Sequence, residues 1–517
     1  MDIYLDANAT TPVLPTAARA AQQAMGDDFG NPSSVHSTGL KARALIDGVR
    51  TRAARLLDAG NGRLLFTSGA TEGIQTAVLS ALNALRGRSD ARLLLYGATE
   101  HKAVPEALRH WNSLLGLNLE VRAIPVDIFG RHDLDFLRRN APQAGLVCTM
   151  AANNETGVIS DLAGIEAALE GSPALWLVDG VQALGKLPLK LSQTRIDYAP
   201  FSGHKLYAPK GIGLLYVRDG APFTPLMAGG GQEGALRSGT ENMAGIAGLG
   251  AVLQALEEGG TFRSHAELGV MREQLLAALR EALPGLVLNV PLEGSLPTTL
   301  NFAVPDVPSR LLQDLFDAGG VRVSGGSACS AAKAAPSFVL EAMGLPEWQA
   351  AGAVRLSIGP ATDAALVDEA CLRIRACGEA LRRHGPQNGP WCEEPGGLSG
   401  DVGDCRLVMG AQLPDFLRLH PDSLLVDVRE PYEHALPLPP LFAMAELQAV
   451  PMSCLGTSAQ AWLSEGRPLL FFCRSGNRSR QAAQALAGMG HEQSWTLAGG
   501  LALLPELEAA PDPALYV

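Results

Sequence analysis

Short, uninterrupted apolar runs recur along most of this chain, and they constrain its fold more than any other feature. Four of them are residues 63–67 (RLLFT), 91–96 (ARLLLY), 145–150 (GLVCTM) and 174–178 (ALWLV). Strands that are apolar throughout are buried on both faces, as in a parallel sheet covered by helices. After the first run, apolar residues recur at helical spacing over residues 74–85. We therefore expect an α/β architecture with a large, mostly parallel sheet.

The composition changes after residue 383. The segment that follows (HGPQNGPWCEEPGGLSGDVGD) is dense in Gly and Pro and carries no periodicity, which is typical of a linker. Beyond it, two further apolar runs, 423–428 and 468–473, alternate with helical stretches and predict a small α/β domain. The expected units are a first domain (1–383), a linker (384–404) and a second domain (405–517), with the first divided into a large part (about 14–258) and a small part (the N-terminal segment and about 259–383).

Composition and charge exclude several classes of protein. Hydrophobic residues make up 47% and charged residues 18% of the 517 residues, which supports large cores and excludes wholesale disorder. A formal net charge of −12 argues against direct binding of nucleic acid. Neither a leader segment nor an apolar run near the ~18 residues of a membrane span is visible, so we expect a cytoplasmic protein without a membrane anchor. The eight cysteines include no CxxC pair, and we expect no metal site.

Three segments of the first domain carry residues that suit a phosphate-bearing cofactor. Residues 67–73 (TSGATEG) lie between an apolar run and a helical pattern, where backbone N–H groups bind anions. Asp179 ends an apolar run and could pair with a protonated ring nitrogen. Lys205, in 201–205 (FSGHK), has neighbours that could desolvate its amine for covalent bonding to a carbonyl carbon. Taken singly, they could equally be a helix cap, an N-cap aspartate and a surface lysine.

Together with other segments, these three resemble the cysteine desulfurases, which are class V relatives of the aminotransferases. The resemblance implies a pyridoxal-phosphate-dependent transferase of fold type I, with pyridoxal 5'-phosphate as its cofactor. The segments that carry it keep their order along the first domain: 4–12 (YLDANATTP), 29–34 (FGNPSS), 66–72 (FTSGATE), 99–104 (TEHKAV), 153–158 (NNETGV), 178–187 (VDGVQALGKL), 201–217, 229–240 (GGGQEGALRSGT) and 324–330 (SGGSACS).

The resemblance implies a role for each matching residue. Lys205 would bind the cofactor covalently, and Asp179 would pair with its ring nitrogen. His101 would stack on the ring and transfer protons, while Arg355 would hold the substrate carboxylate with its guanidinium fork. The other implied contacts are Ala70, Thr71, Ser202 and His204 to the phosphate, Asn154 and Gln182 to the ring oxygen or its surroundings, and Thr240 to a phosphate across a subunit interface, which implies a homodimer.

Cys329 lies among small and polar residues (SGGSACSAAK), which cannot bury it in a packed strand. In the family this position carries the catalytic persulfide. The implied reaction converts L-cysteine to L-alanine, with the Cys329 thiolate attacking the substrate sulfur. A selenocysteine lyase, which shares the fold and cofactor, and a non-enzymatic scaffold are the alternatives; the Cys329 loop and Lys205 favour the desulfurase.

Cys473 is the second cysteine with a distinctive setting. It begins the loop Cys473, Arg474, Ser475, Gly476, Asn477 and Arg478, between an apolar run and a helical pattern. Backbone N–H groups and the two arginines would stabilise a thiolate or a bound anion. Phosphatase loops hold five residues between cysteine and arginine, whereas this loop holds four. With 426–434 (VDVREPYEH) and 497–500 (LAGG), it resembles a single-domain rhodanese, in which Asp427 and Arg429 would be structural and Cys473 would carry the persulfide.

Both domains thus resemble carriers of sulfur on a cysteine. Our hypothesis is that Cys329 takes sulfur from L-cysteine and passes it to Cys473, because a tether raises effective concentration. A sulfur-acceptor protein, such as an iron–sulfur scaffold or a tRNA-thiolation protein, would then receive the sulfur for clusters, thio-cofactors or tRNA. The alternative is that the rhodanese domain takes sulfur from thiosulfate independently.

Overall fold

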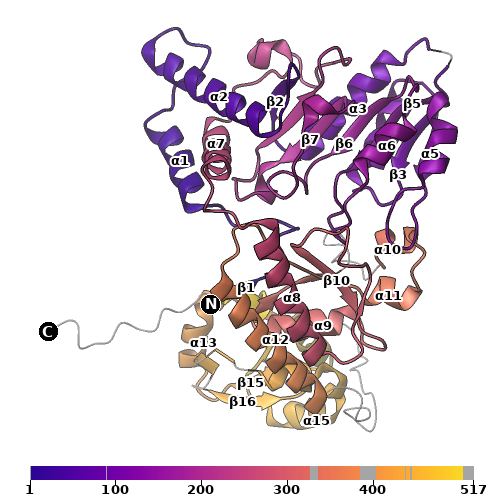
Figure 1. Cartoon of the computed structure of the whole chain (residues 1–517). Coiled ribbons are helices and arrows are strands. Elements are labelled where there is room, and N and C mark those ends of the chain that lie inside the picture. The colour runs from indigo at the N-terminus through magenta and orange to yellow at the C-terminus, as the bar shows by residue number, and fades with distance from the viewer. Residues whose placement is uncertain are drawn as a thin grey trace.

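The computed structural model of the chain describes residues 2–88, 90–325, 336–384, 403–436, 438–439, 441–442 and 445–504. These residues form a large α/β unit, a smaller unit beneath it and a C-terminal α/β domain (Figure 1). The predicted α/β class is confirmed. Within the described residues, none of the helices combines the length and the hydropathy needed to cross a membrane.

The large unit is built on a seven-stranded sheet. All neighbouring strands pair in parallel except β8, which is antiparallel to both β2 and β7. Every residue of β5 is buried, as its apolar sequence predicts. The strands lie in the order β2 (Arg63–Thr67), β8 (Gly213–Val217), β7 (Tyr198–Ser202), β6 (Leu175–Asp179), β5 (Ala144–Met150), β3 (Leu93–Gly97) and β4 (Glu120–Ile124).

Helices cover both faces of this sheet with separate apolar cores. One face is covered by α3 (Ala70–Ala84) and α4 (Ala103–Leu114). The helices that pack on the other face are α1 (Pro15–Gly26), α2 (Ser37–Leu56), α5 (Leu134–Asn140), α6 (Leu162–Ala168) and α7 (Met243–Glu258). Because the loops after β2, β5, β6 and β7 all leave from the carboxyl ends of their strands, this edge gathers side chains that are distant in sequence.

The small unit contains an antiparallel four-stranded sheet. Its strands lie in the order β12 (Ser324–Gly325), β13 (Val354–Ser357), β10 (Thr299–Ala303) and β9 (Val287–Leu288). The N-terminal strand β1 (Ile3–Tyr4) pairs with β11 (Val321–Arg322), so the start of the chain packs with this unit. The helices of the unit are α8 (His265–Ala282), α9 (Ser309–Ala318), α10 (Phe338–Ala342), α11 (Glu347–Gly352) and α12 (Ala364–His384).

The C-terminal domain has a five-stranded parallel sheet. Its strands lie in the order β14 (Arg406–Val408), β18 (Ser494–Leu497), β17 (Leu469–Phe472), β15 (Leu424–Asp427) and β16 (Glu446–Ala449). Side chains of β17 alternate between two cores, with Leu469 and Phe471 on one face and Leu470 and Phe472 on the other. The first core includes α15 (Leu455–Glu465) and α16 (Asn477–Gly488), and the second includes α13 (Leu413–Leu419).

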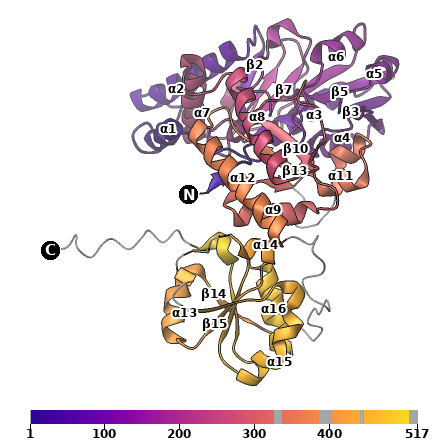
Figure 2. The same ribbon diagram turned by 60° about the horizontal axis from the view of Figure 1, so that its bottom comes forward.

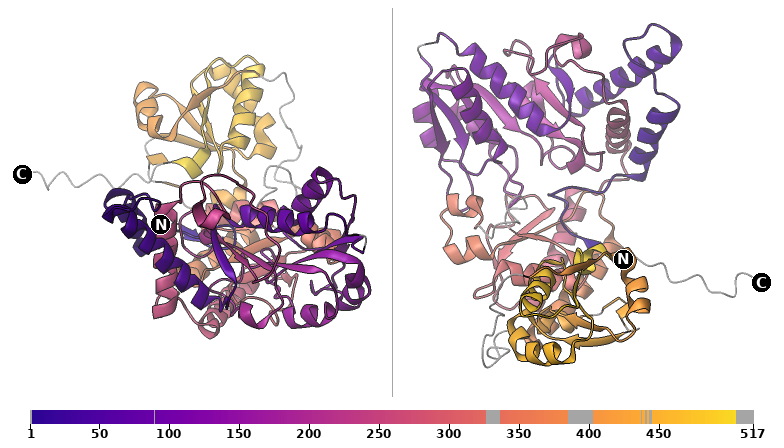
Figure 3. Two further views of the ribbon diagram at one scale, coloured as in Figure 1. Left: turned by 90° about the horizontal axis from the view of Figure 1, so that it is seen from above. Right: turned by 180° about the vertical axis from the view of Figure 1, so that it is seen from behind.

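The C-terminal domain packs against the small unit through α14 (Pro431–His434). Tyr432 and Leu436 are buried in the same apolar cluster as Leu312 and Phe316 of α9 and Ile374 of α12. Figure 2 shows α14 between α9 and the rest of the domain, and Figure 3 shows the domain on the far side of the small unit from the seven-stranded sheet. The domain therefore approaches the rest of the chain by way of α9 and α12.

Candidate active site

A cavity of about 730 Å³ lies between the large and small units, at the carboxyl ends of β2, β5, β6 and β7. Its lining includes residues that come from both units and from the N-terminal segment. The cofactor and substrate contacts expected from the sequence that line it are Ala70, Thr71, His101, Asn154, Asp179, Gln182, Ser202, His204, Lys205 and Arg355. The sheet edge thus brings together side chains that span most of the first domain.

Lys205 lies just beyond β7 and points its amine at the N-terminal segment. Its Nζ donates hydrogen bonds to the carbonyl oxygens of Asn8 (2.6 Å) and Ala9 (2.7 Å). The buried Asn8 side chain in turn donates to Asn154 O and to Thr299 Oγ1, while its Oδ1 has no partner among the described residues. Asn8 therefore helps to build the site, which the sequence analysis did not predict although it quoted the segment.

Asp179 stands at the end of β6, where the sequence analysis placed it. One carboxylate oxygen accepts a hydrogen bond from the backbone N–H of Val181 at 2.9 Å. Burial raises the pKa of Asp179 to about 6, although Val181 and the charge of Lys205 oppose the rise. A positively charged partner would relieve this cost, so the carboxylate suits a cationic ring nitrogen.

Glu100 is a buried carboxyl group that the sequence analysis missed. Both of its oxygens lack a partner among the described residues. Burial and the nearby charge of Asp179 raise the pKa of Glu100 well above its usual value, which favours the protonated form. Its position beside His101 in the quoted segment 99–104 was the only sequence signal that could have pointed to it.

The other end of the cavity suits an anion. The N-terminus of α3 begins at Ala70, where the first backbone N–H groups of the helix have no helical partner. Ser202 and Thr71 add hydroxyl groups to the same lining, and the charge of Glu72 is paired with Arg237 at 3.0 Å. Burial, together with the charges of Lys205 and Lys210, lowers the pKa of His204 to about 4, so its ring is neutral at physiological pH.

His101 lies on the cavity wall, and its Nδ1 accepts a hydrogen bond from the backbone N–H of Ala103 at 3.2 Å. Desolvation by the surrounding protein and the charges of Lys205 and Lys102 lower its pKa. The neutral ring therefore carries its proton on Nε2.

Arg355 reaches the cavity from β13 in the small unit and is 1% exposed. It forms an ion pair with Asp6 at 2.6 Å and donates to the carbonyl oxygen of Asn154 at 3.0 Å. Its Nε has no partner among the described residues. A buried guanidinium with a donor left over suits a carboxylate ligand.

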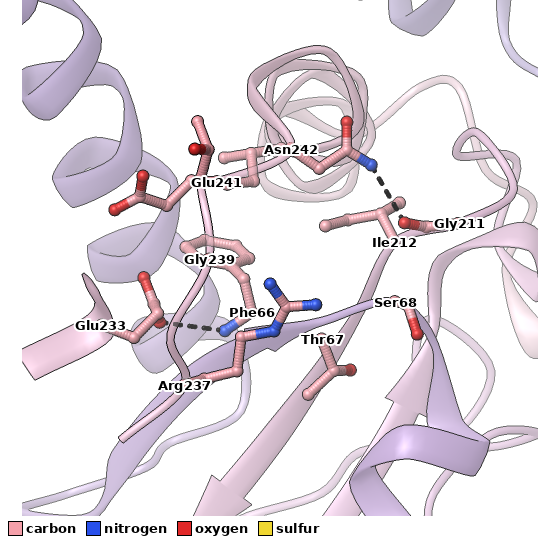
Figure 4. A pocket seen from close by; sticks show the side chains of 12 residues that line it. Phe66, Thr67, Ser68, Gly211, Ile212, Glu233, Arg237, Gly239, Glu241 and Asn242 are labelled. Carbon is pink, nitrogen blue, oxygen red and sulfur yellow. Dashed lines mark hydrogen bonds between the residues drawn. The ribbon is translucent and has the colours of Figure 1, made fainter. Parts of the chain in front are cut away.

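Thr240 lies away from Lys205. It is exposed and lines a separate cavity of about 240 Å³ together with Phe66 and Arg237 (Figure 4). The two cavities share Ser68 and Gly211, so the cavity that Thr240 lines adjoins the anion-binding end. This placement is compatible with a contact across a subunit interface, which stays a prediction.

Cys329 falls in residues 326–335, outside the described residues. On the near side of that segment, Ser324 of β12 is in register with Arg355 of β13. On the far side, Ser337 donates a hydrogen bond to Glu155, a carboxyl group in the cavity lining, at 2.6 Å. The residues on both sides of the segment are therefore anchored at the cavity.

Cys473 follows β17 and is buried. Its Sγ accepts a hydrogen bond from the backbone N–H of Ser479 (3.4 Å) and lies 3.6 Å from Ser479 Oγ. The loop continues into α16, which starts at Asn477. Arg478 makes a two-pronged ion pair with the buried Glu433, at 2.6 and 2.8 Å. The hydrogen bonds and charge of Glu433, aided by Asp314, raise the pKa of Arg478 against the opposing effect of burial.

Two further features of the C-terminal domain bear on its chemistry. Arg429 and Asp427 form a buried ion pair at 2.8 Å directly behind the loop. Arg474 forms an ion pair at 2.9 Å with Asp314 of α9, in the small unit. Neither this contact nor the one between Arg478 and Glu433 could be expected from the sequence, because both depend on how separate elements pack.

The other cysteines within the described residues differ in burial and bonding. Cys148, Cys371 and Cys377 are buried free thiols, Cys405 is a half-buried free thiol, and Cys454 is disulfide-bonded. Burial raises the pKa of the Cys148 and Cys377 thiols. These two thiols are therefore poor nucleophiles.

Comparison with known proteins assigns the two domains to two families. The model of the class V aminotransferases matches residues 3–369, and that of the rhodanese-like domains matches residues 415–503. A cysteine desulfurase of Cereibacter sphaeroides is 38% identical over 369 residues, which cover 71% of this chain and 93% of that protein. The cysteine desulfurase NifS of Azotobacter vinelandii is 35% identical, over 76% of this chain and 98% of its own. A solved NifS-like protein covers 74% of this chain and all of its own, with a TM-score of 0.65 and 32% identity.

Proposed function

The chain belongs to the class V aminotransferase family, as a pyridoxal-phosphate-dependent cysteine desulfurase with a C-terminal rhodanese-like domain, and from this premise we propose that sulfur passes from Cys329 to Cys473. The contact that supports the relay lies on α9. Asp314 pairs with Arg474, the residue after Cys473. The preceding residue, Gln313, packs so closely on Gly325 that a Cβ there would lie 2.9 Å from its Nε2.

Chain length limits how far Cys329 can lie from Gly325, and hence from the contact on α9. Cys329 is four residues beyond Gly325, and four residues span at most about 14 Å when fully extended. Gln313 and Asp314 are neighbours on one helix, so the start of the Cys329 segment and the Cys473 loop contact adjacent positions. This proximity supports transfer within one chain.

The cavity fits pyridoxal phosphate at both ends. The N-terminus of α3, Thr71, Ser202 and neutral His204 would hold the phosphate, and Asp179 would pair with the ring nitrogen. Asn154 and Gln182 would lie near the ring oxygen, and the amine of Lys205 would form the covalent link. When bound, the cofactor supplies an electron sink that labilises bonds at the substrate's Cα and Cβ.

The chain's own residues would then position the substrate and transfer its protons. Arg355 would bind the carboxylate of L-cysteine with its Nε–H, which has no partner among the described residues. His101 would exchange a proton with the substrate at Nε2, since its Nδ1 is held by Ala103. Lys205 would return to its amine form and act as the other proton carrier near the reacting carbon.

Two nucleophilic displacements would transfer the sulfur. The Cys329 thiolate attacks the substrate sulfur, a sulfur–sulfur bond forms, and the carbon–sulfur electron pair stays with the substrate fragment, which leaves as L-alanine after protonation. The Cys473 thiolate then attacks the outer sulfur of the persulfide on Cys329. A new sulfur–sulfur bond forms on Cys473, and Cys329 departs as a thiolate.

Persulfide mapping by mass spectrometry after a pulse of L-cysteine tests this relay. In the wild type we expect additional sulfur on Cys329 and Cys473, and in Cys329→Ser on neither. Cys473→Ala should keep alanine formation and the Cys329 persulfide. Loading of Cys473 in the Cys329→Ser protein, or a bare Cys473 in the wild type, would refute the relay; thiosulfate in place of L-cysteine then identifies an independent donor.

We further propose that the protein acts as a homodimer and supplies a separate acceptor protein for iron–sulfur clusters, thio-cofactors or tRNA. The exposure of Thr240, in the cavity that adjoins the anion-binding end, supports a contribution to the partner's site. Light scattering of the holoenzyme should give twice the chain mass. Thr240→Val should weaken cofactor retention without changing that mass; a monomer that retains full activity would contradict the proposal.

A further inference from the structure

The Cys473 loop is tied to the small unit by carboxylates of α9. Arg474 Nε lies 2.9 Å from Asp314 Oδ1, and its Nη1 lies 3.6 Å from Asp317 Oδ1. Arg478 Nη2 lies 3.8 Å from the other oxygen of Asp314. The carboxylate of Asp314 therefore bridges the two arginines of the loop, although it belongs to a different domain.

Burial at this contact is extensive. Cys473 has 0% exposure and Asp314 has 5%. Beside them, Tyr432 and Leu436 fill an apolar cluster with α9 and α12, which fixes the face of the domain that carries the loop. The Cys473 side chain therefore has no exposed surface in the docked arrangement, and it also packs in the core of its own domain.

The loop has the features of an anion site. It leads into the helix α16, whose Ser479 N–H donates to the sulfur, and it carries two arginines, Arg474 and Arg478. A carboxylate placed between two such arginines competes with any other anion for them. Asp314 thus pairs with the two arginines that a persulfide or a sulfur oxyanion at this loop would need.

We propose that α9 is a docking surface for the C-terminal domain, and that its Asp314 closes the Cys473 loop until an incoming anion displaces it from Arg474 and Arg478. This inference rests on the proposed function insofar as Cys473 carries sulfur. It makes the docked arrangement the closed state of that carrier, and the persulfide on Cys329 would be the incoming anion that displaces Asp314.

The charges around the contact allow it to open. Arg478 keeps its two-pronged partner Glu433 within the C-terminal domain, so its position does not depend on α9. If the contact opens, Asp317 retains its ion pair with Arg322, and Asp314 retains Arg310 at 3.9 Å. Arg474 differs from Arg478 in this respect. Within the described residues, the carboxylates that pair with Arg474 both lie on α9. Opening therefore frees Arg474 to receive the incoming anion.

Alkylation of Cys473 by iodoacetamide measures this closure directly, because the thiolate must be reached to displace iodide. The full-length holoenzyme is treated and the rate at Cys473 is read by mass spectrometry. Asp314→Asn should speed alkylation about tenfold, because it removes a charge-assisted contact that holds the loop shut. Glu273→Gln, an exposed carboxylate on α8 of the same unit, is the matched control and should react at the wild-type rate.

Exchanging the charges of Asp314 and Arg474 tests whether faster alkylation results from loss of their ion pair or from misfolding. Asp314→Arg alone should expose Cys473 at least as much as Asp314→Asn, and adding Arg474→Asp should return the rate toward the wild-type value. Wild-type alkylation rates in both single variants, or equal acceleration in the Glu273→Gln control, would overturn the proposal.

Measurements of sulfur loading distinguish a failure of this proposal from a failure of the relay. Alanine formation and persulfide loading are measured in the same preparations, and alanine formation should be unchanged in Asp314→Asn. A relay that fails leaves Cys473 free of sulfur after L-cysteine in every variant, whereas the alkylation rates report closure whether or not sulfur moves.

Discussion

The cavity around Lys205 and the loop around Cys473 are both electrostatic sites, but they are completed in different ways. In the cavity, buried polar atoms such as Asn8 Oδ1 and Arg355 Nε lack partners among the described residues, and Asp179 is held as a carboxylate at a cost. In the loop, Arg478 donates two hydrogen bonds to Glu433, and Arg474 forms an ion pair with Asp314, although its Nε makes no hydrogen bond within the described residues. The cavity is therefore built to be completed by a ligand, while the charges of the loop are paired within the chain itself.

This difference indicates that the chemistry of the two sites is controlled in different ways. We expect the chemistry in the cavity to depend on what binds there, because several of its buried polar atoms lack partners among the described residues. We expect the chemistry at Cys473 to depend on the displacement of Asp314, because the arginines of its loop are already paired with carboxylates. Three variants and one pH dependence test the contrast, starting with the test of largest expected effect.

Lys205→Ala should abolish alanine formation, a loss of several orders of magnitude, since it removes the amine that we propose binds the cofactor covalently. Alanine assays and the visible absorbance of the cofactor measure the loss. The alkylation rate of Cys473 should be unaffected in the same variant. A parallel change in that rate would mean that the two sites are not independent.

Arg355→Lys should raise the KM for L-cysteine roughly 100-fold, because a lysine cannot offer the two parallel hydrogen bonds of the guanidinium. Steady-state kinetics measure it. Arg272→Lys, a half-buried arginine that donates to the carbonyl oxygens of Leu292 and Leu296, is the control and should leave KM unchanged. An unchanged KM in Arg355→Lys would remove Arg355 from the substrate site.

Glu433→Gln should destabilise the C-terminal domain by about 2 kcal/mol, because the buried charge of Arg478 loses its main partner. Urea unfolding followed by the fluorescence of the tryptophans in this domain gives the value. Glu465→Gln, whose ion pair with Arg467 is exposed, should change stability by less than about 0.5 kcal/mol. Equal effects in the two variants would show that the loop is not held by Glu433.

Cofactor binding by the cofactor-free protein should weaken as pH falls below about 6. Burial raises the pKa of Asp179 to about 6, so below that pH the group takes up a proton and loses its attraction for a cationic ring nitrogen. The extra loss should be roughly tenfold in affinity for each pH unit. Asp179→Asn cannot titrate and provides the control, because the cofactor's own groups titrate in both proteins; equal pH slopes would contradict the assignment.

Much of the fold and of the cavity could be predicted from local sequence. The run RLLFT is β2, residue for residue, and Asp179 was placed at the end of the strand that became β6. Such features are encoded by apolar runs and by the residues that end them. The fold type and the cofactor, in contrast, came from the family resemblance and not from periodicity.

The features that sequence reasoning missed all depend on packing between distant segments. Glu100 has an unremarkable local sequence, and its raised pKa follows from its burial near Asp179. Asn8 matters because strand pairing at the N-terminus carries it to Lys205. The pairing of Arg474 with Asp314 joins residues 160 positions apart and follows from the docking of α14, which no spacing in the sequence encodes.

The central claim is that one sulfur atom visits both cysteines in order. A rapid-quench time course after a pulse of sulfur-labelled L-cysteine, with persulfides quantified by mass spectrometry, tests it most directly. The account predicts that label appears first on Cys329 and reaches Cys473 after a lag, as the label on Cys329 declines. Label on Cys473 without a lag, or an undiminished rise in the Cys329→Ser protein, would contradict it.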